Sequence, residues 1–190
     1  MGIEIHDGLD LWKTRLFDPN VVLRAGGYYG SWGSNAYGIG ASYLVAQYWP
    51  LHRGATFDRI GIGVQTAEAG AGIRLGIYAD DDLDGYPDRL VLDAGVADCG
   101  STGLKTVTIE QHLSAGLYFL ALLGNSGSAL LWMEDVPKYW SPLGTGAEPG
   151  LPTFAWRAAC TYGPLPDTFP AGAAGVNDIW GVCLRAKSAD

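Results

Sequence analysis

Positively charged residues are scarce in this chain of 190 residues, where 12 Lys and Arg stand against 20 Asp and Glu. The net charge is −8, and the cations are dispersed along the sequence. Proteins that bind nucleic acids or anionic membranes cluster Lys and Arg, because these side chains displace the counterions of the phosphates. We therefore expect no nucleic-acid ligand and no attachment to an anionic membrane.

Long apolar runs are also missing, although 48% of the residues are hydrophobic. No apolar stretch approaches the ~20 residues that a membrane-spanning helix needs. The first ten residues include Glu4, Asp7 and Asp10, whereas a secretory signal starts basic and then becomes apolar. The sequence therefore predicts neither membrane insertion nor a signal peptide.

Cysteine is rare and forms no recognisable pair. Cys99, Cys160 and Cys183 are far apart and include no C-x-x-C spacing, which excludes a zinc knuckle and a thioredoxin-type motif. We expect three free thiols in a protein made in a reducing cytoplasm. One disulfide among the three is the alternative.

Motifs of common enzymes are absent as well. The sequence has no G-x-S-x-G nucleophile elbow, no H-E-x-x-H zinc motif and no phosphate-binding loop. A carboxylate pair for glycoside hydrolysis, such as Glu134 with Glu148, stays open, because such a pair is defined by its separation in space. We expect that the protein is not an enzyme.

Short segments of alternating apolar residues are abundant, and so is glycine, with 28 residues. Glycine at this density makes long helices costly and turns easy. In residues 117–123 both alternating sets are apolar, which predicts a strand buried on both faces. The fold class is therefore all-β, a sandwich or a barrel. The predicted strands are 60–64, 73–78, 90–92, 106–109, 117–123, 129–133, 154–160 and 179–184.

The first 23 residues differ from the rest, being more charged and poorer in glycine. We interpret residues 1–23 as an N-terminal arm and residues 24–190 as one β-sandwich domain. The best helical candidate of the chain is 9–17, where Leu9, Trp12 and Leu16 share a face. The apolar side chains of this arm suit burial against a partner protein or a sister chain.

An acidic segment between two predicted strands is the sharpest motif. Residues 80–88 contain D-x-D-x-D-G, and carboxylates at every second residue converge on a hard cation when the chain wraps around it. Gly85 stands at the sharp turn of such a loop, but Val91 stands where a bidentate Glu would end it. The alternative is a metal-free hairpin tip rich in turn residues. The candidate calcium ligands are Asp80, Asp82, Asp84 and Asp88, with the carbonyl of Tyr86.

Aromatic residues are numerous, with seven Trp and ten Tyr. Many lie in two loop-rich segments, 28–37 and 138–162. Flat rings stack on the apolar faces of sugars, while Asp and Asn bind sugar hydroxyls; core packing and subunit interfaces are the alternative roles. The candidate glycan-binding residues are Trp32, Tyr139, Trp140 and Trp156, with Asp135 and Asn125 as hydroxyl acceptors.

Several segments resemble, in the same order, the strands and turns of a β-sandwich domain common in phage tail-fibre and virion structural proteins, including spikes or fibres of gene transfer agents. The resemblance covers residues 24–187, and none of its motifs is catalytic. The chain departs from that family in its short length and in its Asp-rich loop, which replaces a short polar hairpin tip. The segments are 55–62 (ATFDRIGI), 73–78 (IRLGIY), 90–95 (LVLDAG), 116–121 (GLYFLA), 165–170 (LPDTFP) and 180–185 (WGVCLR).

This resemblance implies a jelly-roll-like antiparallel β-sandwich with a short N-terminal arm, carried on a virion. It further implies a fibre or head spike that binds host cell-surface polysaccharide and that residues 1–23 anchor to capsid or tail proteins. We expect a homo-oligomer, a trimer or, at a capsid vertex, a pentamer. A purely structural decoration or adaptor protein is the second hypothesis, and a capsule depolymerase is the third.

Overall fold

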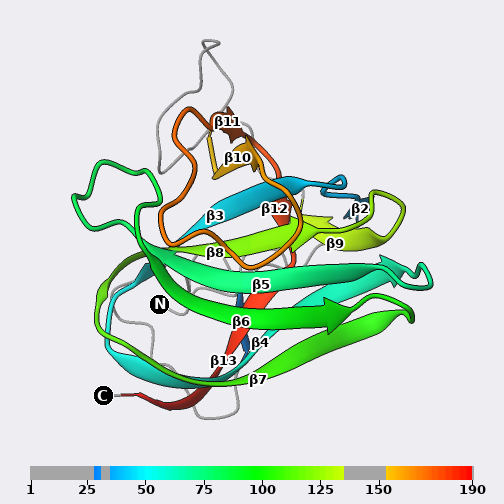
Figure 1. The fold of residues 1–190 in the computed structure, drawn as a ribbon. Coiled ribbons are helices and arrows are strands. Elements are labelled where there is room, and N and C mark those ends of the chain that lie inside the picture. The colour runs from blue at the N-terminus through cyan, green and yellow to red at the C-terminus, as the bar shows by residue number, and fades with distance from the viewer. Residues whose placement is uncertain (1–27, 31–34, 135–152, 190) are drawn as a thin grey trace, which may run out of the picture.

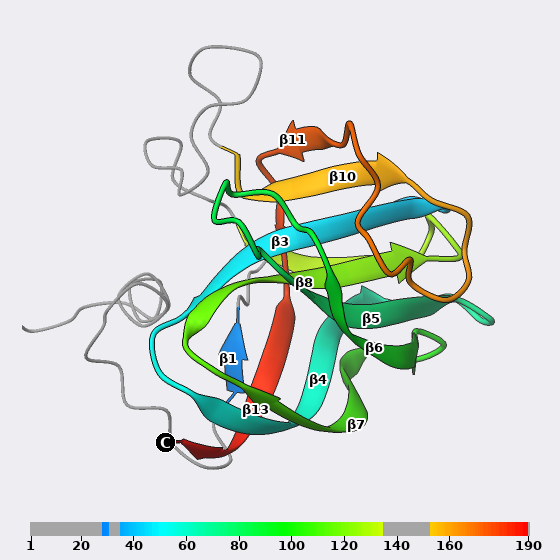
Figure 2. The ribbon, with the colours of Figure 1, turned by 60° about the vertical axis from the view of Figure 1, so that its left-hand side comes forward.

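Two antiparallel β-sheets pack face to face in the computed structural model, which describes residues 28–30, 35–134 and 153–189 (Figures 1 and 2). The arm 1–23 and its helical candidate lie outside the described residues. Within them there is no helix, and the predicted β-sandwich is confirmed. The jelly-roll subdivision stays a prediction.

The first sheet has seven strands in the described part of the chain. Its order is β1-β13-β4-β9-β12, with β2 paired to β9 and β7 paired to β4. The strands are β1 (Tyr28–Gly30), β2 (Asn35–Tyr37), β4 (Ala55–Thr66), β7 (Gly103–Leu113), β9 (Leu130–Glu134), β12 (Ile179–Trp180) and β13 (Val182–Ala189).

The second sheet has six strands in the order β11-β10-β3-β8-β5-β6. They are β3 (Tyr43–Leu51), β5 (Gly72–Ala79), β6 (Leu90–Asp98), β8 (Gly116–Gly124), β10 (Ala155–Ala159) and β11 (Ala174–Val176). The sequence pattern did not predict β3. Its residues 44–47 are all buried, so they show no alternation of apolar and polar side chains.

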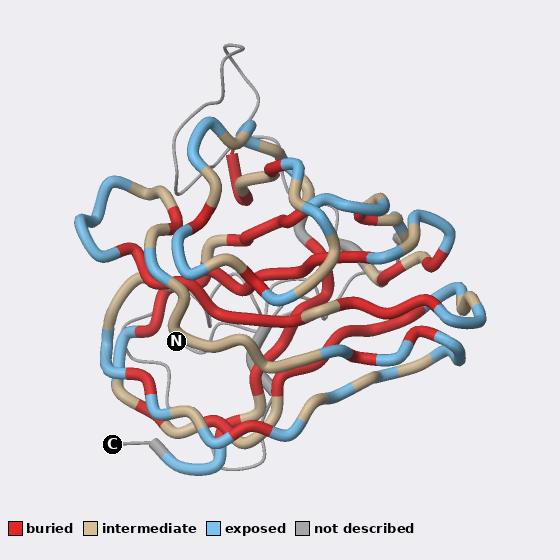
Figure 3. The backbone as a smooth tube through the Cα atoms, in the orientation of Figure 1, coloured by how far each residue is buried: buried red, intermediate tan, exposed pale blue. Residues whose placement is uncertain are grey.

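The main core lies between the two sheets. Phe57, Ile60 and Ile62 of β4 are fully buried there, and Phe57 packs edge-on against Trp49 of β3 with ring centroids 5.6 Å apart. Burial of each such side chain contributes about 1.5–3 kcal/mol. Figure 3 shows the buried backbone concentrated in these central strands, while the connecting loops are exposed.

The second sheet is also buried on its outer face, as the pattern of residues 117–123 predicts. Leu120 and Leu122 of β8 face the main core, whereas Phe119 belongs to a second cluster on the outer face. This cluster is covered by residues 160–173, the segment that crosses in front of β8 and β5 in Figure 1. We call it the covering segment; its apolar anchors are Leu165 and Phe169.

Asp93 of β6 fixes the covering segment to the sheet. Its carboxylate accepts two hydrogen bonds from Arg74 Nε at 2.7 and 2.9 Å and one from the Leu165 N–H at 3.0 Å. Burial by itself raises the pKa of Asp93, but the hydrogen bonds from Arg74, Leu165 and Gly95 outweigh it and hold the pKa below its usual value. The ionised form of Asp93 therefore stabilises the fold.

The cysteines are free, as expected from the sequence: Cys99 and Cys183 are buried and Cys160 is partly buried. Burial raises the pKa of the Cys99 thiol to about 11 and that of Cys183 to about 12. These two thiols therefore stay protonated and weakly nucleophilic at neutral pH.

Replacing Asp93 with Asn should lower the free energy of unfolding by about 1–3 kcal/mol, because charged hydrogen bonds to Arg74 and Leu165 are lost. Since the folded-state pKa is depressed, this stabilisation is present above the unfolded pKa and disappears as the pH falls through the folded pKa. Urea unfolding of wild type and D93N at neutral and acidic pH measures the difference.

The control for this experiment is E110Q. Glu110 forms an ion pair with Lys187, whose Nζ lies 2.7 Å from the carboxylate, but the two side chains are 66% and 53% exposed. Loss of this ion pair should therefore lower the free energy of unfolding by less than about 0.5 kcal/mol. Equal losses in D93N and E110Q would contradict the special role of Asp93.

Candidate functional site

Residues 80–89 form the loop between β5 and β6 and project from one end of the sandwich (Figure 1). The base of this acidic loop is closed by two backbone hydrogen bonds, from the Ala79 N–H to the Arg89 carbonyl at 2.9 Å and from the Asp88 N–H to the Ala79 carbonyl at 2.8 Å. The Asp80 N–H also donates to the Leu117 carbonyl of β8 at 3.1 Å. The loop therefore leaves and re-enters the sheet at fixed positions.

Backbone turns fold the loop back on itself. Leu83 and Gly85 adopt positive φ values of 63° and 84°, a region that glycine enters without steric cost and other residues enter rarely. Four aspartates hold these turns by accepting backbone N–H groups. Asp80 Oδ2 accepts from Gly85 at 3.0 Å, Asp82 Oδ1 from Asp84 at 3.2 Å, Asp84 Oδ1 from Tyr86 at 2.8 Å, and Asp88 Oδ2 from Asp81 at 2.8 Å.

Three of the four predicted calcium ligands converge. One carboxylate oxygen from each of Asp80, Asp82 and Asp88 lies within 4.8 Å of the other two. Asp84 is not part of this group and is exposed on the loop. We call Asp80, Asp82 and Asp88 the acidic triad.

Asp80 is the buried member of the triad. Only 5% of its surface is exposed, and its Oδ1 atom is shielded from solvent without accepting a hydrogen bond from the described residues. Burial raises the pKa of Asp80, hydrogen bonds from the Gly85 and Leu83 N–H groups lower it in part, and the charges of Asp84 and Asp88 raise it further. A bare carboxylate here is costly.

The nearest cation of the loop is already paired. Arg89 Nε and Nη2 donate to the two oxygens of Asp81, each at 2.9 Å. Among the described residues, no ion pair involves a member of the acidic triad. The triad therefore has no protein cation to balance its charge within this part of the structure.

A hollow of about 290 Å³ lies between the acidic loop and the β7–β8 turn. Asp81, Arg89, His112 and Tyr118 contribute to its walls, together with Asp80. Since Asp80 Oδ1 is shielded from solvent, this oxygen is not open to the hollow.

Trp156 of β10 holds the acidic loop against the covering segment. Its indole N–H donates to the Gly85 carbonyl at 2.7 Å, and its ring lies against Tyr86 with centroids 4.9 Å apart. Tyr86 in turn donates its hydroxyl to the Pro170 carbonyl at 2.6 Å and accepts the Ala173 N–H at 3.1 Å. Trp156, a predicted glycan ligand, is therefore half-buried with its N–H engaged.

The other predicted glycan ligands are not brought together in the described structure. Trp32, Asp135, Tyr139 and Trp140 lie outside the described residues, as does Glu148 of the carboxylate pair. Asn125 follows β8 and is exposed, but its side chain accepts the Gly72 N–H at 2.8 Å and donates to the Gly70 carbonyl at 3.2 Å. These bonds hold the turn before β5.

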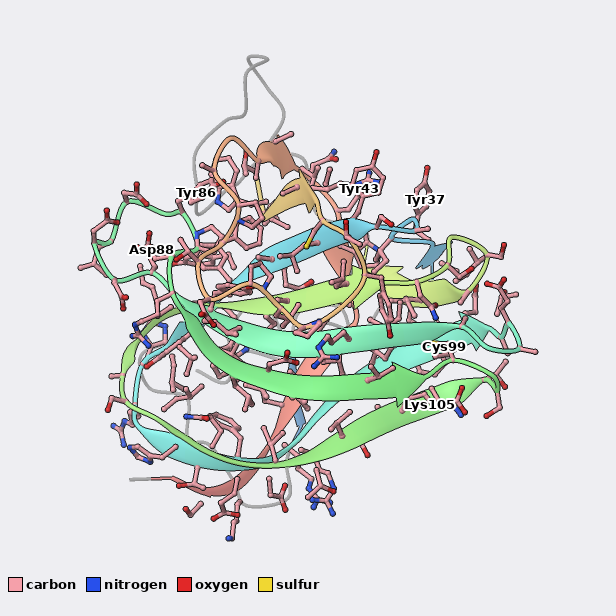
Figure 4. The ribbon with its side chains drawn as sticks, viewed as in Figure 1. Tyr37, Tyr43, Tyr86, Asp88, Cys99 and Lys105 are labelled. Atoms are coloured by element: carbon pink, nitrogen blue, oxygen red, sulfur yellow. The ribbon has the colours of Figure 1, made fainter. Side chains whose placement is uncertain are left out.

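Two exposed tyrosines flank the turn 38–42, and sequence reasoning did not single them out as ligands. Tyr37 of β2 is 59% exposed and Tyr43 of β3 is 39% exposed. The guanidinium carbon of Arg157 lies 3.8 Å from the centroid of the Tyr43 ring. Figure 4 shows both tyrosines well away from Tyr86 and Asp88 of the acidic loop. Tyr37 lay within a segment noted as rich in rings, whereas nothing in the pattern marked Tyr43.

Neither a scan against protein-family models nor a search of curated proteins finds a match to this chain. Across the described ranges, no helix is long and apolar enough to cross a membrane. Function must therefore be inferred from the described geometry and from the sequence resemblance alone.

Replacing Trp156 with Phe keeps a ring beside Tyr86 but removes the hydrogen bond to the Gly85 carbonyl. We expect the free energy of unfolding to fall by about 0.5–1.5 kcal/mol, measured by urea unfolding. An unchanged free energy of unfolding would mean that Trp156 contributes through its ring alone.

Proposed function

We propose that the chain is a non-enzymatic attachment protein of a phage or a phage-like gene transfer agent, a fibre or head spike that binds host cell-surface polysaccharide. The virion assignment is supported by the sequence resemblance. Its segments coincide with β4, β5, β6, β8, the covering segment and the closing strands β12 and β13. These elements contribute side chains to both hydrophobic clusters, together with β3 and β10, so the resemblance concerns much of the framework of the fold.

The observation that carries the binding proposal is the pair of exposed rings, Tyr37 and Tyr43. A tyrosine presents an apolar ring face and a polar hydroxyl together, and an exposed ring of this kind can stack on the apolar face of a sugar. Arg157 packs against Tyr43 and donates to the Ile39 carbonyl at 3.3 Å, which holds the ring in place. A preoriented ring loses little entropy when a pyranose stacks on it.

Charge narrows the class of polysaccharide. With a net charge of −8, the protein repels acidic polymers at long range, so a neutral polysaccharide is the better ligand. The rigid sandwich presents the turn 38–42 at its surface, where a polymer has access without entering a pocket. Such an open site fits recognition of a repeating chain.

The proposal is tested by replacing Tyr37 and Tyr43 with Ala, singly and together, and measuring binding to glycan arrays and to host cells. Each substitution should weaken binding by about three- to tenfold, because each removes one stacking surface. Y43F should bind as the wild type does, since it keeps the ring.

The matched control is L104A, which removes an exposed apolar side chain from β7. Circular dichroism should show that every variant is folded. Wild-type affinity in the folded double variant would contradict the proposed site. A wild-type protein that joins particles but binds no glycan would instead identify a structural decoration protein.

A further inference from the structure

We infer that the acidic loop is a calcium site built on Asp80, Asp82 and Asp88, and that the bound ion fixes the loop against Trp156 and the covering segment. This inference does not depend on the proposed attachment function. It rests on two separate observations: three carboxylates converge, and a buried oxygen of Asp80 accepts no hydrogen bond.

The convergence places three negative charges within the reach of one ion. The triad oxygens lie within 4.8 Å of one another, and ligand oxygens on opposite sides of a calcium ion, each at 2.3–2.6 Å, have about this separation. Mutual repulsion opposes such an arrangement unless a cation is present. The described Lys and Arg side chains form no ion pair with the triad.

The buried oxygen of Asp80 points independently to a ligand. Asp80 Oδ2 is used by the Gly85 N–H at 3.0 Å, whereas Oδ1 is shielded from solvent and accepts no hydrogen bond. Buried polar atoms nearly always have a hydrogen-bond partner, and an exception needs an explanation such as a bound ion. Asp80 contributes one oxygen to the converging group, so the oxygen without a hydrogen bond belongs to a carboxylate of the triad itself.

The donor set selects calcium among the common cations. All triad ligands are carboxylate oxygens, which hard cations prefer, and the cluster contains no His or Cys for zinc. Magnesium demands a tight octahedron, whereas calcium tolerates an irregular shell that water completes. The exposed Asp82 and the absence of a bidentate Glu predict weak binding, with a dissociation constant on the order of 10⁻⁴–10⁻³ M.

The ion would act on more than the loop itself. Asp80 and Asp88 stand at the two ends of the loop, while Asp82 stands near its tip, so one ion joins all three parts. The Gly85 carbonyl and Tyr86 ring of the same loop contact Trp156, and the Asp88 carbonyl accepts the Phe169 N–H at 2.8 Å. Binding therefore stabilises the contact between the acidic loop, β10 and the covering segment.

Terbium, which replaces calcium and luminesces when a nearby tryptophan is excited, tests the site on the purified full chain. Trp156 adjoins the loop, so wild type should show saturable terbium luminescence that calcium displaces. D82N and D80N should weaken both signals by about tenfold or more. D98N, which removes the same charge from the exposed last residue of β6, should bind as the wild type does.

Thermal unfolding supplies the second readout. At a calcium concentration about 100-fold above the dissociation constant, the melting temperature should rise by about 5–10 °C over the chelated protein. The rise should vanish in D82N and persist in D98N. A rise of equal size in D82N, an equal effect of magnesium, or no saturable terbium signal would each overturn the calcium assignment. None of these results involves a glycan, so they leave the proposed attachment function unaffected.

Discussion

Burial of the second sheet on both faces is the constraint on which the rest of the structure depends. Because β8 is apolar on successive residues, its outer face must be covered, and the covering segment does so with Leu165 and Phe169. That segment is held by Asp93 at one point and by Tyr86 at another. Although the acidic loop projects from the end of the sandwich, its contact with the covering segment therefore ties it to the hydrophobic packing.

Much of this framework follows from the sequence, because strand periodicity and turn residues report local preferences. The apolar run 117–123 correctly indicated a strand buried on both faces. The D-x-D-x-D-G spacing pointed to Asp80 and Asp82, which converge with Asp88 from beyond that motif. Strand β3 was not predicted, since a run such as Leu44–Gln47 has no alternation once both faces are buried.

Features that depend on contacts between distant residues could not be predicted. Asp84 has the spacing of a ligand, yet its carboxylate accepts the Tyr86 N–H and lies outside the triad. The hydrogen bond from the Trp156 N–H to the Gly85 carbonyl joins residues 71 positions apart, which the local sequence around Trp156 does not reveal. Tyr43 is exposed because it begins its strand beside the turn 38–42, which no residue pattern reveals.

The central claim is that one calcium ion joins the acidic triad and holds the loop against Trp156. A calcium titration followed by two-dimensional ¹H–¹⁵N NMR tests it most directly, because each N–H reports on its own position. The account predicts saturable shifts of the Gly85 and Tyr86 amides and of the Trp156 indole N–H, with little change at Tyr43. Absence of shifts in the acidic loop, or saturable shifts confined to another part of the chain, would contradict it.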